Sequence, residues 1–353
     1  MPLNRIRIEG LRCLNEVDFS PHPKRTYFFG PNGAGKTSLL EGIYLLGRGR
    51  SFRTRHSRRL IQHGQERFSV YGELSLKSRN HRLGVGLGPS GLELRLDSEP
   101  AVGMSSLAKI MPVHVIDPNI HSLIEGSPGD RRRFLDWGVF HVEHGYLDAW
   151  RRYRRTLGQR NAALKLGQGS AVWDASLLEA GTEVDIARRR YAEDLVTALE
   201  GLGEALLGSP LEVSYRAGWP EGLDFCKALE ASNNRDLANG TTHVGPHRAD
   251  LSVKLASRSV REEVSRGQQK LVAAGLILAQ IKVFAANNEN GGLLLVDDPA
   301  AELDGAALSA LLSALDKLPA QQIITGLTES ILPPAPGFPV FHVEQGHITK
   351  MVQ

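Results

Sequence analysis

The 353-residue sequence has few cysteines, and the two that it has, Cys13 and Cys226, lie far apart. They offer no disulfide framework, and such a pair suits a reducing compartment. No apolar signal-peptide core is present near the start, and the longest apolar run, Leu271–Ile281, is too short to span a bilayer. We therefore expect a soluble cytoplasmic protein without a membrane partner.

The sequence also lacks a strong charge of either sign, because its formal net charge is only +3. This value is too small to indicate a nucleic-acid partner, so any such partner must be argued from local clusters of charge. The composition, 41% hydrophobic and 23% charged, is ordinary for a globular protein. A chain of this length can bury one large core or two moderate ones, and we expect two lobes.

A glycine-rich stretch follows an aromatic strand near the start of the chain. Gly30, Gly35, Lys36 and Thr37 have the spacing of a phosphate-binding loop, and apolar residues at helical spacing follow them. In such a loop, backbone N–H groups surround the phosphates, the lysine reaches the β and γ oxygens, and the threonine hydroxyl binds Mg²⁺. The alternative is a turn that only joins strand to helix. We expect a nucleoside triphosphate as ligand.

Strand patterns and helical patterns divide the chain. We expect an opening hairpin near residues 5–19, antiparallel strands over 64–96, and a strand before Pro118. A helix of about thirty residues is expected from Ser127, and a second helix follows the Gly/Ser break near 167–170. These helices predict a short antiparallel arm. The predicted domains are a first part of an α/β lobe (1–120), a helical arm lobe (121–242) and the second part of the α/β lobe (243–353).

Two carboxylates follow a second buried strand, Leu293–Val296. Asp297 is placed to hold Mg²⁺ through water, and Asp298 to orient or deprotonate the attacking water. The alternative is a pair of solvated acids that cap the strand. Upstream, Ser265 and Gln268 predict a capping box at the start of an apolar helix.

Ser-x-Gly-Gln at this helix start resembles the signature motif of ABC-type ATPases, which serves the γ-phosphate of a nucleotide bound by the partner subunit. Together with "GPNGAGKTSLLEGIYLLGRGRSFR", "SPGDRRRFLDW", "THVGPHRADL" and "LLLVDDPAAELD", it resembles the RecF family of bacterial recombination mediators, which are related to the ATPase heads of SMC proteins. The resemblance covers nearly the whole chain. It implies an ATP-dependent DNA-binding protein of gap repair and replication restart, with RecR as partner and RecA loading as outcome.

The resemblance also assigns residues to roles. Asp297 is assigned to Mg²⁺ and Asp298 to the role of general base, and Lys36 is the other catalytic residue. Asp304 is assigned as the D-loop aspartate. The signature acting on the partner's ATP comprises Ser265, Arg266, Gly267 and Gln268. The ATP-binding loop comprises Gly30, Pro31, Asn32, Gly33, Ala34, Gly35, Lys36, Thr37 and Ser38, and Mg²⁺ is assigned to Thr37 and Asp297.

The sequence departs from the wider ABC pattern in three places. Gly326 stands where transporter ATPases carry a switch histidine, and Asp298 stands where the superfamily usually has glutamate. No glutamine occurs in "VIDPNIHSLIEG", where a Q-loop would be sought. The resemblance therefore leaves open what replaces the Q-loop and the histidine.

Two arginine clusters are candidates for contacts with DNA phosphates, since clustered arginine binds DNA without reading its sequence. The alternative without a function is a solvated loop for the first cluster and an ordinary helix surface for the second. Arg53 could instead contact the nucleotide. The candidates are Arg48, Arg50, Arg53, Arg55, Arg58 and Arg59 in one segment, and Arg151, Arg152, Arg154 and Arg155 on the arm. The turn Gly245-Pro246-His247-Arg248 could sense nucleotide state or brace the lobes, and the sequence does not decide between these roles.

From these patterns and the resemblance we expect an ABC-type P-loop ATPase head, similar to SMC heads, with an inserted, mostly helical lobe and no long coiled coil. It should be a weak ATPase that binds ATP and Mg²⁺ and forms an ATP-dependent, head-to-tail homodimer on DNA. One rival is the nucleotide-binding subunit of a transporter, which would normally carry the missing histidine. The other is a small-molecule kinase or GTPase, which has no need of a signature helix.

Overall fold

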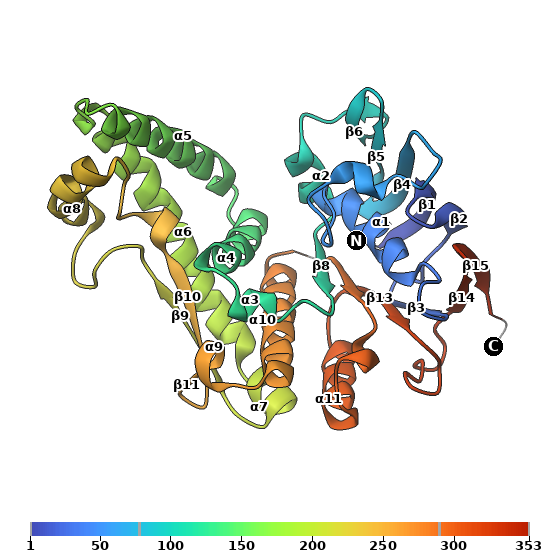
Figure 1. Ribbon diagram of the computed structural model, residues 1–353. Coiled ribbons are helices and arrows are strands. Elements are labelled where there is room, and N and C mark those ends of the chain that lie inside the picture. Colours follow the sequence, from blue (N-terminus) through green and yellow to red (C-terminus); the bar gives the residue numbers. More distant parts are fainter. Residues whose placement is uncertain (1, 77–78, 289–290, 352–353) are drawn as a thin grey trace. The chain divides into compact units, whose positions relative to one another are not determined.

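The computed structural model describes residues 2–76, 79–288 and 291–351, and its elements are shown in Figure 1. They form two compact units. The first comprises Met1–Ile120 together with Phe284–Gln353, and the second comprises His121–Val283. Residues 77 and 78, within the predicted strands of 64–96, lie outside the described residues.

The first unit contains two six-stranded sheets. One is antiparallel, in the order β2-β1-β4-β5-β6-β7, so the predicted opening hairpin and the antiparallel strands after it are confirmed. Its strands are β1 (Leu3–Leu11), β2 (Leu14–Phe19), β4 (Phe68–Leu76), β5 (Arg79–Gly88), β6 (Gly91–Leu96) and β7 (Glu99–Pro100).

The other sheet has the order β15-β14-β3-β13-β12-β8. All neighbouring strands from β14 to β8 are parallel, and β15 alone is antiparallel to its neighbour. The strands are β3 (Arg25–Phe29), β8 (Val113–Ile116), β12 (Leu293–Val296), β13 (Gln321–Gly326), β14 (Val340–Glu344) and β15 (His347–Lys350). Because β3, β13, β12 and β8 run in the same direction, the residues that follow each of them meet at one edge of the sheet.

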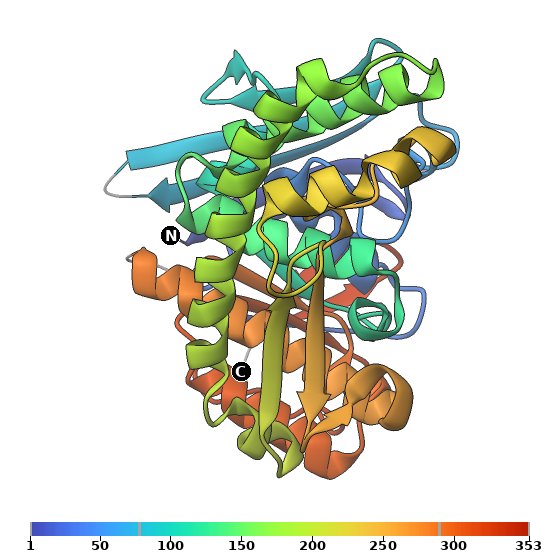
Figure 2. The same cartoon turned by 90° about the vertical axis from the view of Figure 1, so that its left-hand side faces the viewer.

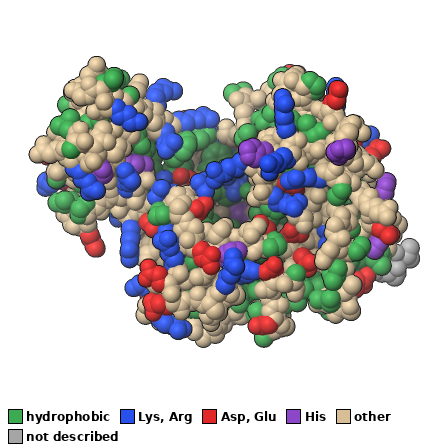
Figure 3. Space-filling view, in the orientation of Figure 1, with side chains coloured by type: hydrophobic (Ala, Val, Ile, Leu, Met, Phe, Trp, Pro, Cys, Tyr) green, Lys and Arg blue, Asp and Glu red, His purple; other side chains and the backbone are tan. Residues whose placement is uncertain are grey.

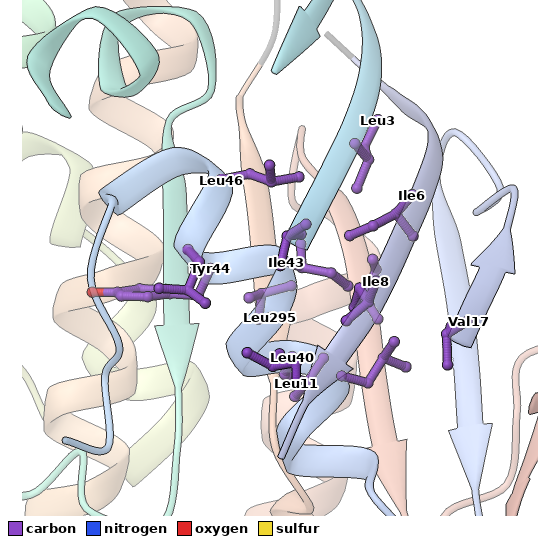
Figure 4. Packing of buried hydrophobic residues seen from close by; sticks show 14 of the residues in the cluster. Leu3, Ile6, Ile8, Leu11, Val17, Leu40, Ile43, Tyr44, Leu46 and Leu295 are labelled. Atoms are coloured by element: carbon purple, nitrogen blue, oxygen red, sulfur yellow. The ribbon is translucent and has the colours of Figure 1, made fainter. Parts of the chain in front are cut away.

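Helix α1 (Lys36–Arg48) lies between the two sheets and joins their cores. Leu40, Ile43 and Leu46 are fully buried, and they point into a cluster shared with Ile8 of β1 and Leu295 of β12 (Figure 4). Truncating one such side chain to alanine typically costs about 2–5 kcal/mol of unfolding free energy. The core therefore fixes the start of α1 relative to the parallel sheet. The other helices of this unit are α2 (Met104–Ile110) and α11 (Gly305–Asp316).

The second unit consists of helices and a three-stranded antiparallel sheet in the order β11-β10-β9 (Figure 2). Its strands are β9 (Leu211–Arg216), β10 (Asp250–Leu255) and β11 (Arg258–Ser259). Its helices are α3 (Ser122–Glu125), α4 (Pro128–Val142), α5 (Tyr146–Lys165), α6 (Asp174–Leu199), α7 (Leu202–Leu207), α8 (Phe225–Asn239), α9 (Val260–Glu263) and most of α10 (Arg266–Asn287).

The predicted arm is present, with a correction to its helices. The helix that starts after Ser127 was expected to run for about thirty residues, but it is broken between α4 and α5 at Glu143-His144-Gly145, where the Glu143 backbone is extended. α5 and α6 then pack antiparallel, because Arg152 bonds Glu183 while Arg160, further along α5, bonds Asp174 at the start of α6. The predicted second helix is likewise interrupted, by Gly201 between α6 and α7.

The grouping of residues 243–283 differs from the predicted domains. This segment, which includes β10 and the start of α10, belongs to the second compact unit, whereas the sequence analysis placed it in the α/β lobe. Its functional assignment stays a prediction. Helix α10 is long and apolar enough to cross a membrane by length and composition, but 67% of its apolar window is buried inside the protein, as expected for a core helix.

Candidate functional site

The loop between β3 and α1 forms an open cradle at the edge of the parallel sheet. Gly35 precedes the first helical residue with a φ of 115°, a conformation that favours glycine, and no side chain caps the helix start. No acidic residue lies in the first turn of α1. The N–H groups of that turn are therefore suited to an anion.

Two other turns of the first unit support this loop. The Gly346 N–H, between β14 and β15, donates to the Ala34 carbonyl at 2.9 Å. A Cβ at Gly30 would lie 2.1 Å from the Val343 carbonyl oxygen, so the loop could not pass β14 with any larger residue. Cys13, after β1, has its Sγ 3.8 Å from the Ser38 hydroxyl. No local sequence pattern indicates this support, because the contacts join segments that lie far apart in the chain.

Lys36 lies in the cradle, and its side chain is buried. Its Nζ donates to the carbonyl oxygens of Gly30 at 2.6 Å and Pro31 at 3.1 Å. Burial lowers the pKa of Lys36, and the charges of Asp298 and Asp297 oppose that shift. Both of these hydrogen-bond acceptors are neutral.

Thr37 and Asp297, 260 positions apart, meet at this edge of the sheet. The Thr37 hydroxyl donates to Asp297 Oδ1 at 3.1 Å. Thr325, at the end of β13 between them, donates to the same oxygen at 2.9 Å. Burial raises the pKa of Asp297, while the bonds from Thr325 and Thr37 and the charges of Arg53 and Lys36 lower it. Thr325 was missed by the sequence analysis, although it directly precedes the glycine that stands in place of the switch histidine.

Asp298 adopts a left-handed backbone conformation, with φ 44° and ψ 60°. This conformation is uncommon for a residue with a side chain, and such strain clusters at functional sites. Burial raises the pKa of Asp298, and Lys36 lowers it. Asp304 lies at the start of α11, where it caps the helix by accepting the Ala307 N–H at 2.9 Å.

The position of the missing histidine has no room for a side chain. A Cβ at Gly326 would lie 2.9 Å from the Phe29 ring and 3.0 Å from Leu332 Cδ2. Packing therefore excludes a histidine here unless its neighbours move.

A third carboxylate stands at the end of β8, in the segment where no glutamine was found. The Asp297 N–H donates to the Ile116 carbonyl at 2.8 Å, so Asp117 follows β8 directly beside Asp297. Burial and the charge of Asp297 raise the pKa of Asp117 to about 6.

The oxygen donors suit Mg²⁺, which prefers oxygen ligands and keeps several waters. Thr37 and Asp297 supply a hydroxyl and a carboxylate at one point. Among the residues that the structure describes, no group of three or more His, Cys, Asp or Glu side chains could hold a metal ion. A Mg²⁺ at this point would therefore depend on phosphate and water oxygens as well.

The first arginine segment, 48–59, is anchored next to this site. Glu41, fully buried on α1, accepts two bonds from Arg12 at 2.9 and 3.0 Å and contacts the Ser51 hydroxyl. Arg53 lies 3.9 Å from the same carboxylate and is exposed. The role of Glu41 was not predicted from the sequence, although an acid within the apolar stretch of α1 is a signal that could have indicated it.

The arginines of this segment are not equivalent. Arg48 donates to the Tyr44 hydroxyl at 3.0 Å and is partly buried. The exposed members are Arg50, Arg53, Arg55, Arg58 and Arg59. Lys and Arg side chains gather on the face of the first unit that Figure 3 shows. On the arm, Arg152 is bound to Glu183 at 2.6 Å and Arg151 lies 3.7 Å from Asp148.

The signature segment begins α10 in the second unit. The Gln268 N–H donates to the Ser265 hydroxyl and the Ser265 N–H donates to Gln268 Oε1, both at 3.4 Å, so the predicted capping box is present. Ser265, Arg266, Gly267 and Gln268 are all exposed. Arg266 also donates to His121 Nε2 at 2.7 Å.

Comparisons with known proteins agree with this architecture. Residues 2–349 match the family described as "RecF/RecN/SMC N terminal domain". The chain is 39% identical over 362 residues to "DNA replication and repair protein RecF" of Stutzerimonas stutzeri (strain A1501), covering 99% of this chain and 98% of that protein. It is 36% identical over 357 residues to the protein of the same name from Shewanella baltica (strain OS155 / ATCC BAA-1091), covering 99% of both.

Solved structures show the same fold. "Structure of the recombination mediator protein RecF-ATPrS in RecFOR pathway" aligns with a TM-score of 0.86 at 25% identity, covering 99% of both chains. An Smc head bound to the C-winged helix domain of ScpA aligns with a TM-score of 0.63 at 15% identity, covering 99% of this chain and 97% of that one. The fold is thus that of an ABC-type ATPase head with an inserted helical lobe, as the sequence predicted, and the described residues contain no long coiled coil.

Proposed function

Because the chain belongs to the RecF family of the RecF/RecN/SMC group, we propose that it is an ATP-dependent DNA-binding protein of recombinational gap repair and replication restart. The relatives are named as replication and repair proteins, and a similar structure is described with a nucleotide in the RecFOR pathway. The observation that carries the proposal is the contact of Thr37 with Asp297 beside an open phosphate-binding loop.

ATP binding would use the loop of residues 30–38. The phosphates would accept bonds from the N–H groups at the start of α1, and Lys36 would exchange its two carbonyl partners for β and γ oxygens. Thr37 and Asp297 would hold Mg²⁺, whose charge offsets the negative charge that develops during phosphoryl transfer. Thr325 keeps the Asp297 carboxylate aimed at Thr37.

Hydrolysis would use Asp298 to orient and deprotonate water. Burial raises its pKa toward the range of a general base. Its side chain is one methylene shorter than the usual glutamate, and Gly326 supplies no histidine to hold the γ-phosphate. Ordinary enzymes turn over roughly 10 times per second. We expect hydrolysis by this protein to be much slower, as suits a switch that releases DNA slowly.

The site would be completed by a second copy of the chain. Ser265, Gly267 and the start of α10 are exposed, and a helix start with a free surface suits the γ-phosphate of a partner's ATP. ATP would then join two copies head to tail around two nucleotides, with Asp304 as the D-loop residue near the interface. ADP should not suffice, because it lacks the γ-phosphate.

The dimer would grip DNA through phosphate contacts. The exposed arginines of 48–59 are the proposed contacts in the first unit, with Arg53 shared between DNA and nucleotide since its charge already acts on Asp297. RecR is the proposed partner, and RecA loading the outcome. Binding should fall steeply with salt and be similar on unrelated sequences.

The test is sedimentation of three variants with and without ATP. Lys36→Met should lose ATP binding and dimerisation together, whereas Ser265→Arg should keep ATP binding and lose the dimer. Asp298→Asn should accumulate ATP-bound dimers that hold DNA longer. Ser176→Arg, an equal addition on the exposed face of α6, serves as control. A Ser265→Arg protein that dimerises normally with ATP would refute the shared site, and failure of ATP to promote duplex binding would refute the function.

A further inference from the structure

The turn of residues 242–249 contains the Gly-Pro-His-Arg motif that the sequence left without a role. Three arginines from different elements bond its backbone carbonyls. Arg188 of α6 donates to Pro246 at 2.6 Å, Arg132 of α4 donates to Ala249 at 2.6 Å, and Arg248 donates to Thr242 at 3.4 Å. Guanidinium groups from α4, from α6 and from the turn itself therefore meet at this turn.

Only part of this charge is neutralised within the unit. Arg188 pairs with Asp136 at 2.7 Å, and Arg131, the neighbour of Arg132, pairs with Asp250 at 2.8 Å. Among the described residues, no carboxylate lies within ion-pair distance of Arg132, Arg154 or Arg248. We refer to these three residues as the arginine surface.

The excess of positive charge at the turn affects the pKa values of its side chains. Burial and the charges of Arg188 and Arg248 lower the pKa of Arg132, although two aspartates oppose them. Burial lowers the pKa of His247 to about 4, and the charges of Arg248, Arg132 and Arg154 all contribute. His247 is consequently neutral at pH 7, and its ring is held between the Tyr153 hydroxyl at 2.6 Å and the Thr242 carbonyl at 3.0 Å.

The arginine surface is accessible. Arg154 and Arg248 are exposed, and Arg132 is half-buried. The Arg154 guanidinium lies 5.6 Å from the centre of the Trp150 ring, which restricts it without neutralising it. Two other arm arginines of the same predicted cluster differ in this respect, because Arg152 is paired with Glu183 and Arg151 lies near Asp148.

We propose that the arginine surface binds the phosphodiester backbone of duplex DNA, giving the second unit its own DNA contact. The inference rests on the proposed function. Arg132 and Arg248 bond carbonyl groups of the turn, and Arg154 follows Tyr153, whose hydroxyl contacts His247 in the same turn. Clustered guanidinium groups without carboxylate partners bind backbone phosphates without reading the base sequence.

The test uses fluorescence anisotropy with two labelled duplexes of unrelated sequence, in ATP, over a range of salt concentrations. The variant is Arg154→Gln with Arg248→Gln. The control is Lys254→Gln with Arg258→Gln, which removes the same charge from exposed positions toward the far end of β10. We expect the variant to bind both duplexes about tenfold more weakly and its salt slope to fall by about two, at roughly 0.9 per lost phosphate contact. The control should match the wild type, and all proteins should bind ATP equally.

A second variant, Arg154→Lys with Arg248→Lys, keeps the charge and should retain most of the affinity. If the lysine variant loses as much affinity for duplex DNA as the glutamine variant, the inference is wrong while the proposed function stands. The same holds if the glutamine variant binds duplex DNA as tightly as the control. If the glutamine variant loses binding to labelled polyglutamate but not to DNA, the surface serves an acidic protein instead. Failure of the wild type to bind duplex DNA with ATP would remove the proposed function itself.

Discussion

In the second unit, the buried guanidinium of Arg160 contacts Asp236 at 2.8 Å and Asp174 at 2.7 Å, whereas in the first unit the buried ammonium of Lys36 bonds the carbonyl oxygens of Gly30 and Pro31. The buried charge thus has charged partners in the second unit and neutral partners in the first. Arg160 and its partners tie α5, α6 and α8 together. Lys36 lies at an open loop, where its charge is available to a ligand.

This difference separates structural charge from functional charge. The charge of Arg160 is compensated by carboxylates of its own unit, and breaking such an arrangement leaves a buried ion without compensation. A buried ammonium group with neutral partners keeps its full charge for an anion. The same contrast holds for Asp297, whose hydrogen-bond partners are the hydroxyl groups of Thr37 and Thr325. Four predictions test the comparison, in decreasing order of expected effect.

Arg160→Ala should destabilise the second unit by about 3–5 kcal/mol, because it removes the guanidinium partner of the buried Asp236 carboxylate. All four tryptophans lie in that unit, so urea unfolding followed by their fluorescence reports on it. Arg152→Ala breaks the exposed pair with Glu183 and should cost about 0–1 kcal/mol. Equal costs for the two variants would show that burial does not distinguish these pairs.

His247 should make the second unit less stable in acid. The pKa of His247 in the folded protein is lowered to about 4, below the ordinary 6.5. The contribution of the neutral ring to the free energy of unfolding is therefore complete above about pH 6.5 and is lost as the pH falls toward 4. The loss is at most about 3 kcal/mol. His247→Gln should be less sensitive over this window, measured by urea unfolding at pH 7.5 and pH 4.5. Parallel pH profiles of the two proteins would contradict the assignment.

MgATP should stabilise the first unit by about 2.7 kcal/mol at a hundredfold excess over its Kd. The measurement is hydrogen exchange of the α1 amides, made in a Ser265→Arg background so that dimerisation does not contribute. EDTA should reduce the protection, and Lys36→Met should abolish it. Lys317→Met, at an exposed position of the same unit, is the matched control. Equal protection of α5 and α6 would mean that the ligand does not act on the first unit alone.

Thr325→Val should weaken the binding of MgATP by about 1 kcal/mol, or roughly fivefold, because Asp297 loses one of its two hydroxyl donors. Titration of Mg²⁺ at fixed ATP measures the effect. Thr349→Val, an exposed change on β15, should leave the titration unchanged. An unaltered Mg²⁺ dependence in Thr325→Val would show that Thr325 does not position the carboxylate.

Local patterns in the sequence were sufficient for the elements whose signals are short. The spacing of Gly30, Gly35, Lys36 and Thr37 predicted a loop before a helix, and the apolar run Leu293–Val296 predicted the buried strand before Asp297. The capping box at Ser265 was also readable, since both partners lie within four residues. These predictions succeeded because the backbone near each residue depends mainly on neighbours in the chain.

Contacts between distant segments were decided by the tertiary structure. The order β3-β13-β12 places Thr325 between the phosphate-binding loop and Asp297, and no local pattern encodes strand order. Charge behaved in the same way. The sequence counted arginines, but the fold determined that Arg152 is neutralised by Glu183 while Arg154, two residues later, has no such partner among the described residues. Composition sets how many charges a chain has, and packing determines which of them remain available for a ligand.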